Sequence, residues 1–347
     1  MNLKALSHKL GLSQTTVSRA LNGYPEVSQK TRERVLKMAA EMNYQPNRFA
    51  KSLATGKSGH VGLIYPVEHN IITPIFNEFL SGITARLVES GMDLSIMPTT
   101  VATEMSTYRS VVNTGRVDGL ILSSPLCQDP RIDYLMETEL PFIVHGRVCD
   151  HQSQPQPETA NFSYIDVDNS GAFYKATNLL IDMGHRHIAL LNGDESMTFA
   201  YHRYQGYRQA LDDAAISFEP TLAFSLPDMT EQQGFAATLR ALSSQPQPTA
   251  LLVSSIILAL GATRAIRESG LEPGKDISLI TYDDDLPYLE AARFNPSLTT
   301  VHSSIRQAGY EITHHLHEMI QSNGRHQIRK ILDVDLIARS STRAMHP

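Results

Sequence analysis

The sequence is poor in the residues and patterns that mark several classes of protein. It contains no tryptophan, two cysteines and only 7% aromatic residues among its 347 residues. No run of apolar residues approaches the length of about 18 that a membrane-spanning helix requires. The first residues also lack the apolar segment of a signal peptide. We therefore expect a cytoplasmic protein with no membrane partner.

The two cysteines, Cys127 and Cys149, are far apart in sequence and form no Cys-x-x-Cys motif. Such a pair could form a disulfide, but cysteines in a reducing compartment are more often free. We expect two free thiols.

Motifs of catalysis and cofactor binding are also missing. The sequence contains no GxSxG, HExxH or GxGxxG pattern. Gly56-Lys57-Ser58 resembles the end of a phosphate-binding loop, but Lys51 stands where the first glycine belongs, and a strand follows the motif instead of preceding it. We therefore predict that the protein is not an enzyme and has no cofactor.

Three histidines, His314, His315 and His317, lie close together in a predicted helix. Histidines in such an arrangement can bind a metal ion when an acid or a cysteine completes the set. We find no such residue at ligand spacing, so we expect a solvated helix face and no metal.

Charge divides the chain into two unequal parts. Residues 1–57 carry ten basic and three acidic side chains, a formal net charge of +7. The whole chain carries −6, which leaves −13 for residues 58–347. A basic head on an acidic body favours a head that binds a polyanion.

A short amphipathic helix is predicted within residues 12–23, LSQTTVSRALNG. Val17, Ala20 and Leu21 share its apolar face. Ser13 precedes it as an N-cap, and Asn22-Gly23 ends it. Its amide, hydroxyl and guanidinium groups could read base edges in a major groove, and they belong to Gln14, Thr15, Thr16, Ser18, Arg19 and Asn22.

Helices predicted on both sides complete a three-helix unit. Leu3, Leu6 and Leu10 form an apolar stripe that ends at Gly11, and Ser28 caps a third helix. Three short helices with a tight turn between the first two are typical of a helix-turn-helix DNA-binding unit. An ordinary amphipathic helical hairpin would give the same pattern.

Two stretches, TTVSRALNGYPEVSQKTRERV and YQPNRFAKSLATGKSGHVGLIYP, resemble the head and hinge of the lactose-repressor and galactose-repressor (LacI/GalR) family. The resemblance implies a DNA-binding domain at residues 1–46 and a hinge helix with its linker at residues 47–57. In that family the hinge helices of two subunits pair in the minor groove, where an apolar wedge opens a base step. The implied hinge contacts with DNA are Asn47, Arg48 and the wedge Leu53; a plain flexible linker is the alternative.

Beyond His60, apolar strands alternate regularly with amphipathic helices, and a second series begins at YIDVDN. This alternation predicts two α/β lobes with doubly wound parallel sheets. The resemblance implies that residues 58–347 form a core similar to periplasmic sugar-binding proteins, with the ligand between the lobes. We expect lobe 1 at about 59–160 plus 290–320 and lobe 2 at about 161–289 plus 321–347.

Candidate effector residues come from the ends of strands, where parallel sheets bind ligands. Position alone favours Ser123, His145 and Arg147, while Phe76 offers either a surface for a sugar ring or a core side chain. The resemblance implies that Asp283 and Arg203 grip the effector, a carboxylate accepting from hydroxyls and a guanidinium donating to oxygens. A helix-terminal ion pair is the alternative.

One position departs from the family pattern. Ser255-Ile256 stands where the family often has Asn-Asp. We therefore expect Ser255 to hold the ligand differently from the common hexose sensors, and we favour a neutral carbohydrate such as a glucoside or another disaccharide.

Taken together, the sequence predicts a homodimeric transcriptional repressor that binds a pseudo-palindromic operator and responds to a sugar-like effector. Two alternatives are a sugar-binding protein without a DNA function and a nucleotide-dependent enzyme. The basic head weighs against the first and the missing phosphate loop against the second. The sequence leaves open whether the effector is an inducer or a corepressor.

Overall fold

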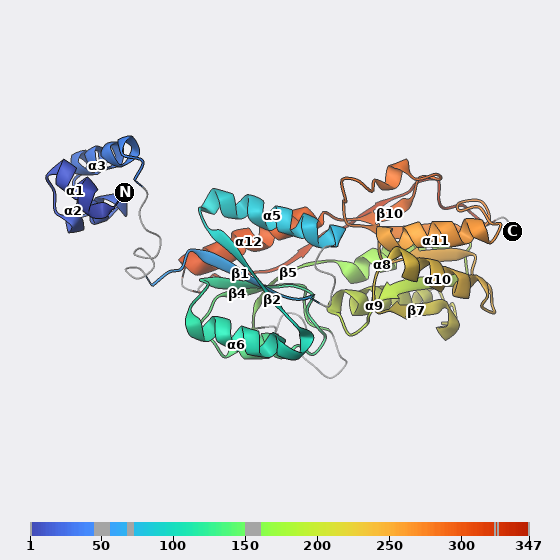
Figure 1. Cartoon of the computed structure of the whole chain (residues 1–347). Coiled ribbons are helices and arrows are strands. Elements are labelled where there is room, and N and C mark those ends of the chain that lie inside the picture. Colours follow the sequence, from blue (N-terminus) through green and yellow to red (C-terminus); the bar gives the residue numbers. More distant parts are fainter. Residues whose placement is uncertain are drawn as a thin grey trace. The chain divides into compact units, whose positions relative to one another are not determined.

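The structure is a computed structural model that describes residues 2–44, 56–67, 73–149, 161–322, 324 and 326–345. The chain divides into two compact units, Met1–Gly59 and His60–Pro347 (Figure 1). Residues 47–55 of the predicted hinge, with Asn47, Arg48 and Leu53, lie outside the described residues.

The first unit contains three short helices: α1 (Leu3–Leu10), α2 (Gln14–Leu21) and α3 (Gln29–Glu41). Each begins with a side chain that accepts a hydrogen bond from the first turn, supplied by Asn2, Ser13 and Ser28. Gly11 adopts a φ of +64° between α1 and α2, which a glycine tolerates without strain. The small core consists of Leu6, Leu10, Val17, Ala20, Val27, Val35 and Ala39.

The second unit contains two six-stranded sheets, which define its two lobes. The first sheet has the order β11-β5-β4-β3-β1-β2 and only parallel pairs. Its strands are β1 (His60–Pro66), β2 (Asp93–Thr99), β3 (Gly119–Leu122), β4 (Phe142–His145), β5 (Ser163–Val167) and β11 (Arg329–Leu332). Two cores cover its faces, one with α5 (Pro74–Ser90) and α12 (Ile305–Gln321), the other with α6 (Glu104–Thr114) and α7 (Pro130–Met136).

The second sheet has the order β12-β10-β9-β8-β6-β7, in which only β12 is antiparallel to its neighbour. Its strands are β6 (Ile188–Gly193), β7 (Ala223–Leu226), β8 (Ala250–Val253), β9 (Ser278–Asp283), β10 (Thr299–His302) and β12 (Asp335–Ile337). One core contains α8 (Asn169–Asp182) and α9 (Thr198–Asp213), and the other contains α10 (Glu231–Leu242) and α11 (Ile256–Glu268). The predicted pair of doubly wound α/β lobes is confirmed.

The lobe boundaries differ from the predicted ones. β5, expected to open lobe 2, lies in the first sheet between β4 and β11, and β10, expected in lobe 1, lies in the second sheet. The chain therefore crosses between the lobes after β5, between β10 and α12, and between β11 and β12. A buried strand has the same apolar pattern in either sheet, so its sequence does not reveal which sheet it joins.

The helices α5 and α12 lie side by side across the first sheet (Figure 1). Their backbones approach closely because each presents a glycine to the other. A Cβ at Gly82 would overlap the carbonyl oxygen of Arg306, and one at Gly309 would overlap that of Phe79.

The expectation of two free thiols is wrong for this structure, because Cys127 and Cys149 form a disulfide. Cys127 follows β3 and Cys149 follows β4, and these strands are parallel neighbours in the first sheet. Their carboxyl ends therefore lie side by side, which brings the two Cα atoms to 5.0 Å, a separation that a disulfide can span.

Among the described residues, no helix combines the length and the apolar character needed to cross a membrane.

Candidate functional site

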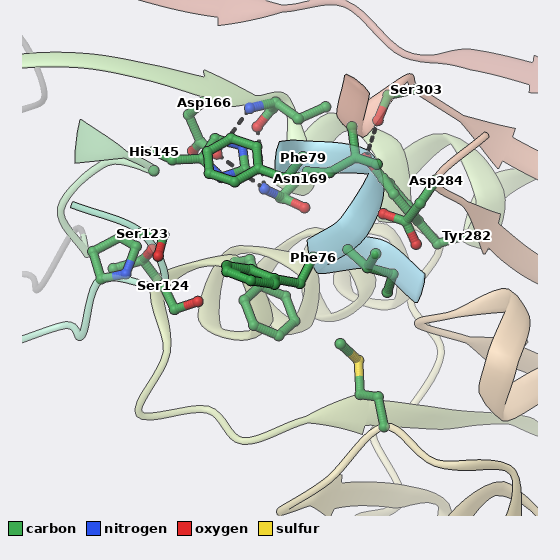
Figure 2. Close-up of a pocket in the computed structure, with 18 of the residues that line it drawn as sticks. Phe76, Phe79, Ser123, Ser124, His145, Asp166, Asn169, Tyr282, Asp284 and Ser303 are labelled. Carbon is green, nitrogen blue, oxygen red and sulfur yellow. Dashed lines mark hydrogen bonds between the residues drawn. The ribbon is translucent and has the colours of Figure 1, made fainter. Parts of the chain in front are cut away.

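A cavity of about 200 Å³ lies where the two lobes of the second unit meet. Its walls come from the carboxyl ends of strands in both sheets and from the helices that follow them (Figure 2). Parallel sheets place ligand groups at this end of their strands. The polar residues that line it include Ser123, His145, Asp166, Asn169, Arg203, Ser254, Tyr282, Asp284 and Ser303.

Arg203, in the first half of α9, supplies a positively charged side chain to the cavity wall. Its Nε donates to Asn169 Oδ1 at 2.8 Å, and its Nη1 donates to the backbone oxygen of Ser254 at 2.6 Å. The guanidinium carbon also lies 3.8 Å from the centre of the Tyr282 ring. These contacts fix the orientation of a side chain that is only 6% exposed. A planar guanidinium held this way can donate to oxygen atoms of a ligand.

Two carboxylates, the buried Asp166 and the half-buried Asp284, face the same cavity. Burial raises the pKa of both to about 6, although Arg147 opposes this for Asp166 and Arg203 opposes it for Asp284. Asp166 Oδ1 accepts from the Val167 backbone and from Asn169, whereas its buried Oδ2 has no hydrogen-bond donor among the described residues. Arg147 Nε lies 3.5 Å from Oδ2 as an ion-pair partner, and this oxygen is still able to accept a hydrogen bond from a ligand.

Aromatic rings form another part of the wall. Phe76, at the start of α5, packs against Tyr65 of β1 with ring centres 4.4 Å apart. His145 stacks on Phe79 at 4.7 Å, and burial lowers the pKa of this histidine to about 4. The imidazole is therefore neutral near pH 7. The cavity thus combines charged groups with flat apolar faces.

An ion pair between Arg131 and Asp129 fixes the edge of the cavity that carries the Ser123 and Ser124 hydroxyls. Ser123 and Ser124 line the cavity just beyond β3. Arg131 donates to the backbone oxygen of Ser124 and makes a two-pronged contact with Asp129, through Nε at 2.9 Å and Nη2 at 2.6 Å. This network fixes a segment in which Ser124 has a φ of +50°.

Four of the seven predicted effector residues line this cavity, namely Phe76, Ser123, His145 and Arg203. Arg147 lies behind it, where its Nε is 3.5 Å from Asp166 Oδ2. Ser255 is the N-cap of α11 and accepts from the Ile257 backbone, so its neighbour Ser254 lines the cavity instead.

The third exception is Asp283, the last residue of β9. Its Oδ1 accepts from the Asp285 backbone, and its Oδ2 lies 3.8 Å from His302 on the neighbouring strand. The next residue, Asp284, lines the cavity. Successive side chains of a strand point to opposite sides, so an error of one residue exchanges the carboxylate that meets the ligand.

Several lining residues escaped the sequence interpretation. Asp166 and Asn169 sit in YIDVDN, a segment read only as the start of a second lobe. Asp166 lies near the carboxyl end of β5 and Asn169 begins α8, so the rule of strand ends points to both whichever sheet the strand joins. Tyr282 and Tyr65 lack any polar pattern that separates them from core residues.

A second cavity of about 220 Å³ adjoins the first. The two share Tyr65, Ser123 and Phe199 among their walls, and the second extends toward Asp194 and Asp228 in the second lobe. The adjoining cavities offer room for a ligand with two linked parts.

In the first unit, α2 presents a polar face to solvent. Gln14, Thr15, Arg19 and Asn22 are exposed, whereas Thr16 and Ser18 are partly covered. Thr16 hydrogen-bonds Ser13, and Ser18 offers its backbone oxygen to Asn22 Nδ2 at 2.9 Å. Gln14, Thr15 and Arg19 can contact a groove of DNA, because α2 packs on the core through its apolar face, with Val17 and Ala20.

Comparisons with known proteins find matches in both units of the chain. Residues 4–47 match the family described as bacterial regulatory proteins, lacI family, and residues 177–342 match the periplasmic binding protein-like domain. The chain is 43% identical to the HTH-type transcriptional regulator AglR of Rhizobium meliloti (strain 1021), over 99% of this chain and 94% of that protein.

Two solved structures are similar along almost the whole chain. A complex of the transcriptional regulator CelR with cellobiose is 29% identical, with a TM-score of 0.72 over 98% of this chain and 99% of that one. The lac repressor dimer bound to operator and the anti-inducer ONPF is also 29% identical, with a TM-score of 0.81 over 99% of each chain.

Proposed function

Because the chain belongs to the LacI family of bacterial regulatory proteins, we propose that it represses a carbohydrate operon and that a small sugar-like effector switches its affinity for operator DNA. It is a DNA-binding transcriptional regulator and not an enzyme. A regulator of this kind works in the cytoplasm, where its DNA lies. The proposal concerns the ligand, the residues that hold it and the mode of DNA binding.

The cavity between the lobes carries the assignment of the effector. Sugars present hydroxyl groups that both donate and accept, and rings with apolar faces. Asp166 and Asp284 supply acceptors, and Arg203 supplies a donor. Phe76 offers its ring to an apolar face. This set of groups fits a neutral carbohydrate better than an anion, since two carboxylates would repel negative charge.

The adjoining second cavity favours a disaccharide over a single sugar ring. One ring would occupy the cavity with Arg203 and Asp284, and the other would extend past Ser123 toward Asp194. The bound ligand of the similar CelR structure, cellobiose, is also a disaccharide.

For the DNA side we propose a homodimer in which each copy presents α2 to one half-site of a pseudo-palindrome, as two-fold symmetry requires. Gln14, Thr15 and Arg19 are the proposed base-reading residues. Residues 1–46 would serve as the DNA-binding domain and 47–57 as the hinge. The similar lac repressor structure is a dimer on its operator.

Two measurements test this proposal. In a thermal-shift screen of mono- and disaccharides, a ligand at about 100 times its dissociation constant should add roughly 2.7 kcal/mol to the free energy of unfolding. In a gel shift with DNA upstream of the chain's own gene, the same sugar should change operator affinity.

Matched variants make the test specific to the cavity. Asp284→Asn should abolish the sugar response, whereas Asp283→Asn, one residue away and outside the cavity, should retain it. A sugar that shifts both variants equally would show that it binds elsewhere. Failure of every sugar to act on a protein that still binds its operator would refute the carbohydrate assignment.

A further inference from the structure

Two histidines and a glutamate converge near the end of α12, and none of them lines the cavity. His315 and Glu318 lie one turn apart on α12, and His326 comes from the segment between α12 and β11. The His326 backbone donates to Ser322 Oγ at 3.1 Å, which holds His326 near the end of the helix. The sequence interpretation considered only the neighbouring histidines and missed the acid and His326.

The three potential ligand atoms form a compact triangle. Glu318 Oε2 lies 3.0 Å from His315 Nδ1 and 3.1 Å from His326 Nε2, and the two nitrogens are 3.4 Å apart. A zinc ion binds nitrogen and oxygen ligands at about 2.0–2.2 Å with tetrahedral angles, which places neighbouring ligand atoms roughly 3.4 Å apart. The triangle needs to open by only a few tenths of an ångström to accept such an ion.

Neighbouring side chains orient the triangle from outside. Arg86 Nε donates to His314 Nδ1 at 3.2 Å, so the neutral His314 carries its proton on Nε2. That Nε2 lies 3.6 Å from Glu318 Oε1, the oxygen that is not part of the triangle. His314 is therefore placed to support the carboxylate and not to bind the ion itself.

His315 has a comparable arrangement on its far side. Its Nε2 lies 3.8 Å from Glu311 Oε2, and Glu311 in turn accepts from Lys330 Nζ at 3.1 Å. Without an ion, the nearer carboxylate, Glu318 at 3.0 Å, favours a proton on Nδ1; once Nδ1 binds an ion, Glu311 would accept from Nε2. In zinc sites such supporting carboxylates orient the ligands and raise their basicity.

We propose that His315, Glu318 and His326 bind one divalent transition-metal ion of the zinc class. Two imidazoles and one carboxylate are a donor set that zinc accepts, with water in the fourth position. The ion would fasten the end of α12 to the segment that leads into β11, from which the chain crosses to lobe 2 at β12.

The exposure of the cluster also suits an ion. The side chains of Glu318 and His326 are 41% and 37% exposed, which gives an ion a path from solvent.

The test uses the full-length chain without a histidine tag, dialysed against a chelator and titrated with Zn²⁺ in competition with a chromophoric chelator. Co²⁺ serves as a second probe, since its visible absorption reports tetrahedral coordination. We expect one tight ion per chain. His315→Ala and Glu318→Gln should lose this ion, and His314→Ala should bind roughly 10–100-fold more weakly.

His317→Ala is the matched control, because it removes a histidine from the same helix outside the triangle. His317 Nδ1 lies 3.3 Å from Arg86 Nη2, and its Nε2 lies 3.2 Å from Gln321. It should bind Zn²⁺ as the wild type does. Equal loss in this control would assign the binding to a general patch of histidines and overturn the proposal.

His326→Ala keeps the test decisive if a helix variant fails to fold, since His326 lies outside α12. Zn²⁺ should raise the melting temperature of the wild type and leave that of His326→Ala unchanged. Unaltered zinc affinity in His326→Ala would show that the three side chains form only a hydrogen-bonded cluster.

Discussion

On α2 the polar side chains stand in solvent, whereas in the cavity between the lobes they are buried and paired. Gln14 and Arg19 are exposed, and the apolar side of α2 alone joins the head's core. By contrast, Arg203 is buried and Asp284 is half-buried, and the two charges interact. The polar face of α2 loses its hydration only when DNA binds, whereas the polar groups of the cavity lose theirs when the chain folds.

Function and folding stability are therefore coupled in the cavity but not on the exposed face of α2. A buried charge whose partner is removed is costly, whereas an exposed side chain can be removed with little effect on the folded state. Variants in the cavity should therefore change stability as well as ligand affinity. Variants on the exposed face of α2 should change DNA affinity alone.

The largest effect is expected for Arg203→Ala. The substitution leaves Asn169 Oδ1 and the Ser254 carbonyl without their donor and Asp284 without its nearby cation. Loss of one partner from such a buried network costs about 3–5 kcal/mol. Urea unfolding of the full-length protein measures it.

Arg208→Ala is the control for that experiment, because Arg208 lies on the same helix and stacks on Phe218, away from the cavity. It should cost much less. A comparable loss in both variants would mean that the cavity arginine has no special place in the fold.

The next effect concerns pH and Asp284. Burial raises its pKa from 3.8 to about 6, so the folded protein retains a proton that the unfolded chain releases in this interval. The group's contribution to stability is complete below pH about 4 and is lost as the pH rises to about 6. Each pKa unit corresponds to roughly 1.4 kcal/mol.

Asp284→Asn should therefore be more stable than the wild type at pH 7 in the absence of ligand, although it no longer responds to the effector. Unfolding curves at pH 4, 5, 6 and 7 follow the difference, and Asp212→Asn, an exposed acid on α9, should show none. If the difference in free energy of unfolding between the wild type and Asp284→Asn did not vary with pH, the raised pKa of Asp284 would be contradicted.

The order of the elements could be predicted from the sequence, because apolar periodicity reports whether a strand or a helix is buried. Apolar periodicity does not predict which strand pairs with which. β5 was expected in lobe 2, yet it pairs with β4 and β11. Cys127 and Cys149 meet for the same reason, since only the pairing of β3 with β4 brings them together.

The candidate site shows the same limit at the scale of one residue. Strand-end reasoning located the right segment, but the pleat decides whether Asp283 or Asp284 faces the ligand. The family resemblance identifies Arg203, whereas its partner Asn169, the first residue of α8, is not among the residues predicted from the sequence. Residues far apart in sequence are joined by topology, which local patterns do not contain.

On the exposed surface, Gln14→Ala and Arg19→Ala should each weaken binding to the cognate operator by roughly 1–3 kcal/mol. Binding to scrambled DNA should change little, and the melting temperature should stay at the wild-type value because both side chains are exposed. Fluorescence anisotropy with both DNAs measures the two affinities. Lys37→Ala, on α3, removes a charge elsewhere in the head and should weaken both DNAs alike.

Equal losses on both DNAs for Gln14→Ala or Arg19→Ala would reduce these side chains to phosphate contacts. A lower melting temperature would show that the exposed face of α2 contributes to the stability of the fold, contrary to the contrast drawn with the cavity.

The smallest effect should come from Ser13→Ala. This substitution lowers the stability of α2 and leaves its proposed base-reading side chains in place. Ser13 Oγ accepts from the Thr16 backbone at 3.0 Å, and loss of such a cap costs about 0.5–2 kcal/mol. Operator affinity should fall modestly on cognate and scrambled DNA together, while sugar binding in the other unit stays unchanged. Ser28→Ala removes the equivalent cap of α3 and should affect the head's stability similarly. Selective loss of cognate binding in Ser13→Ala would instead place Ser13 among the residues that read the bases.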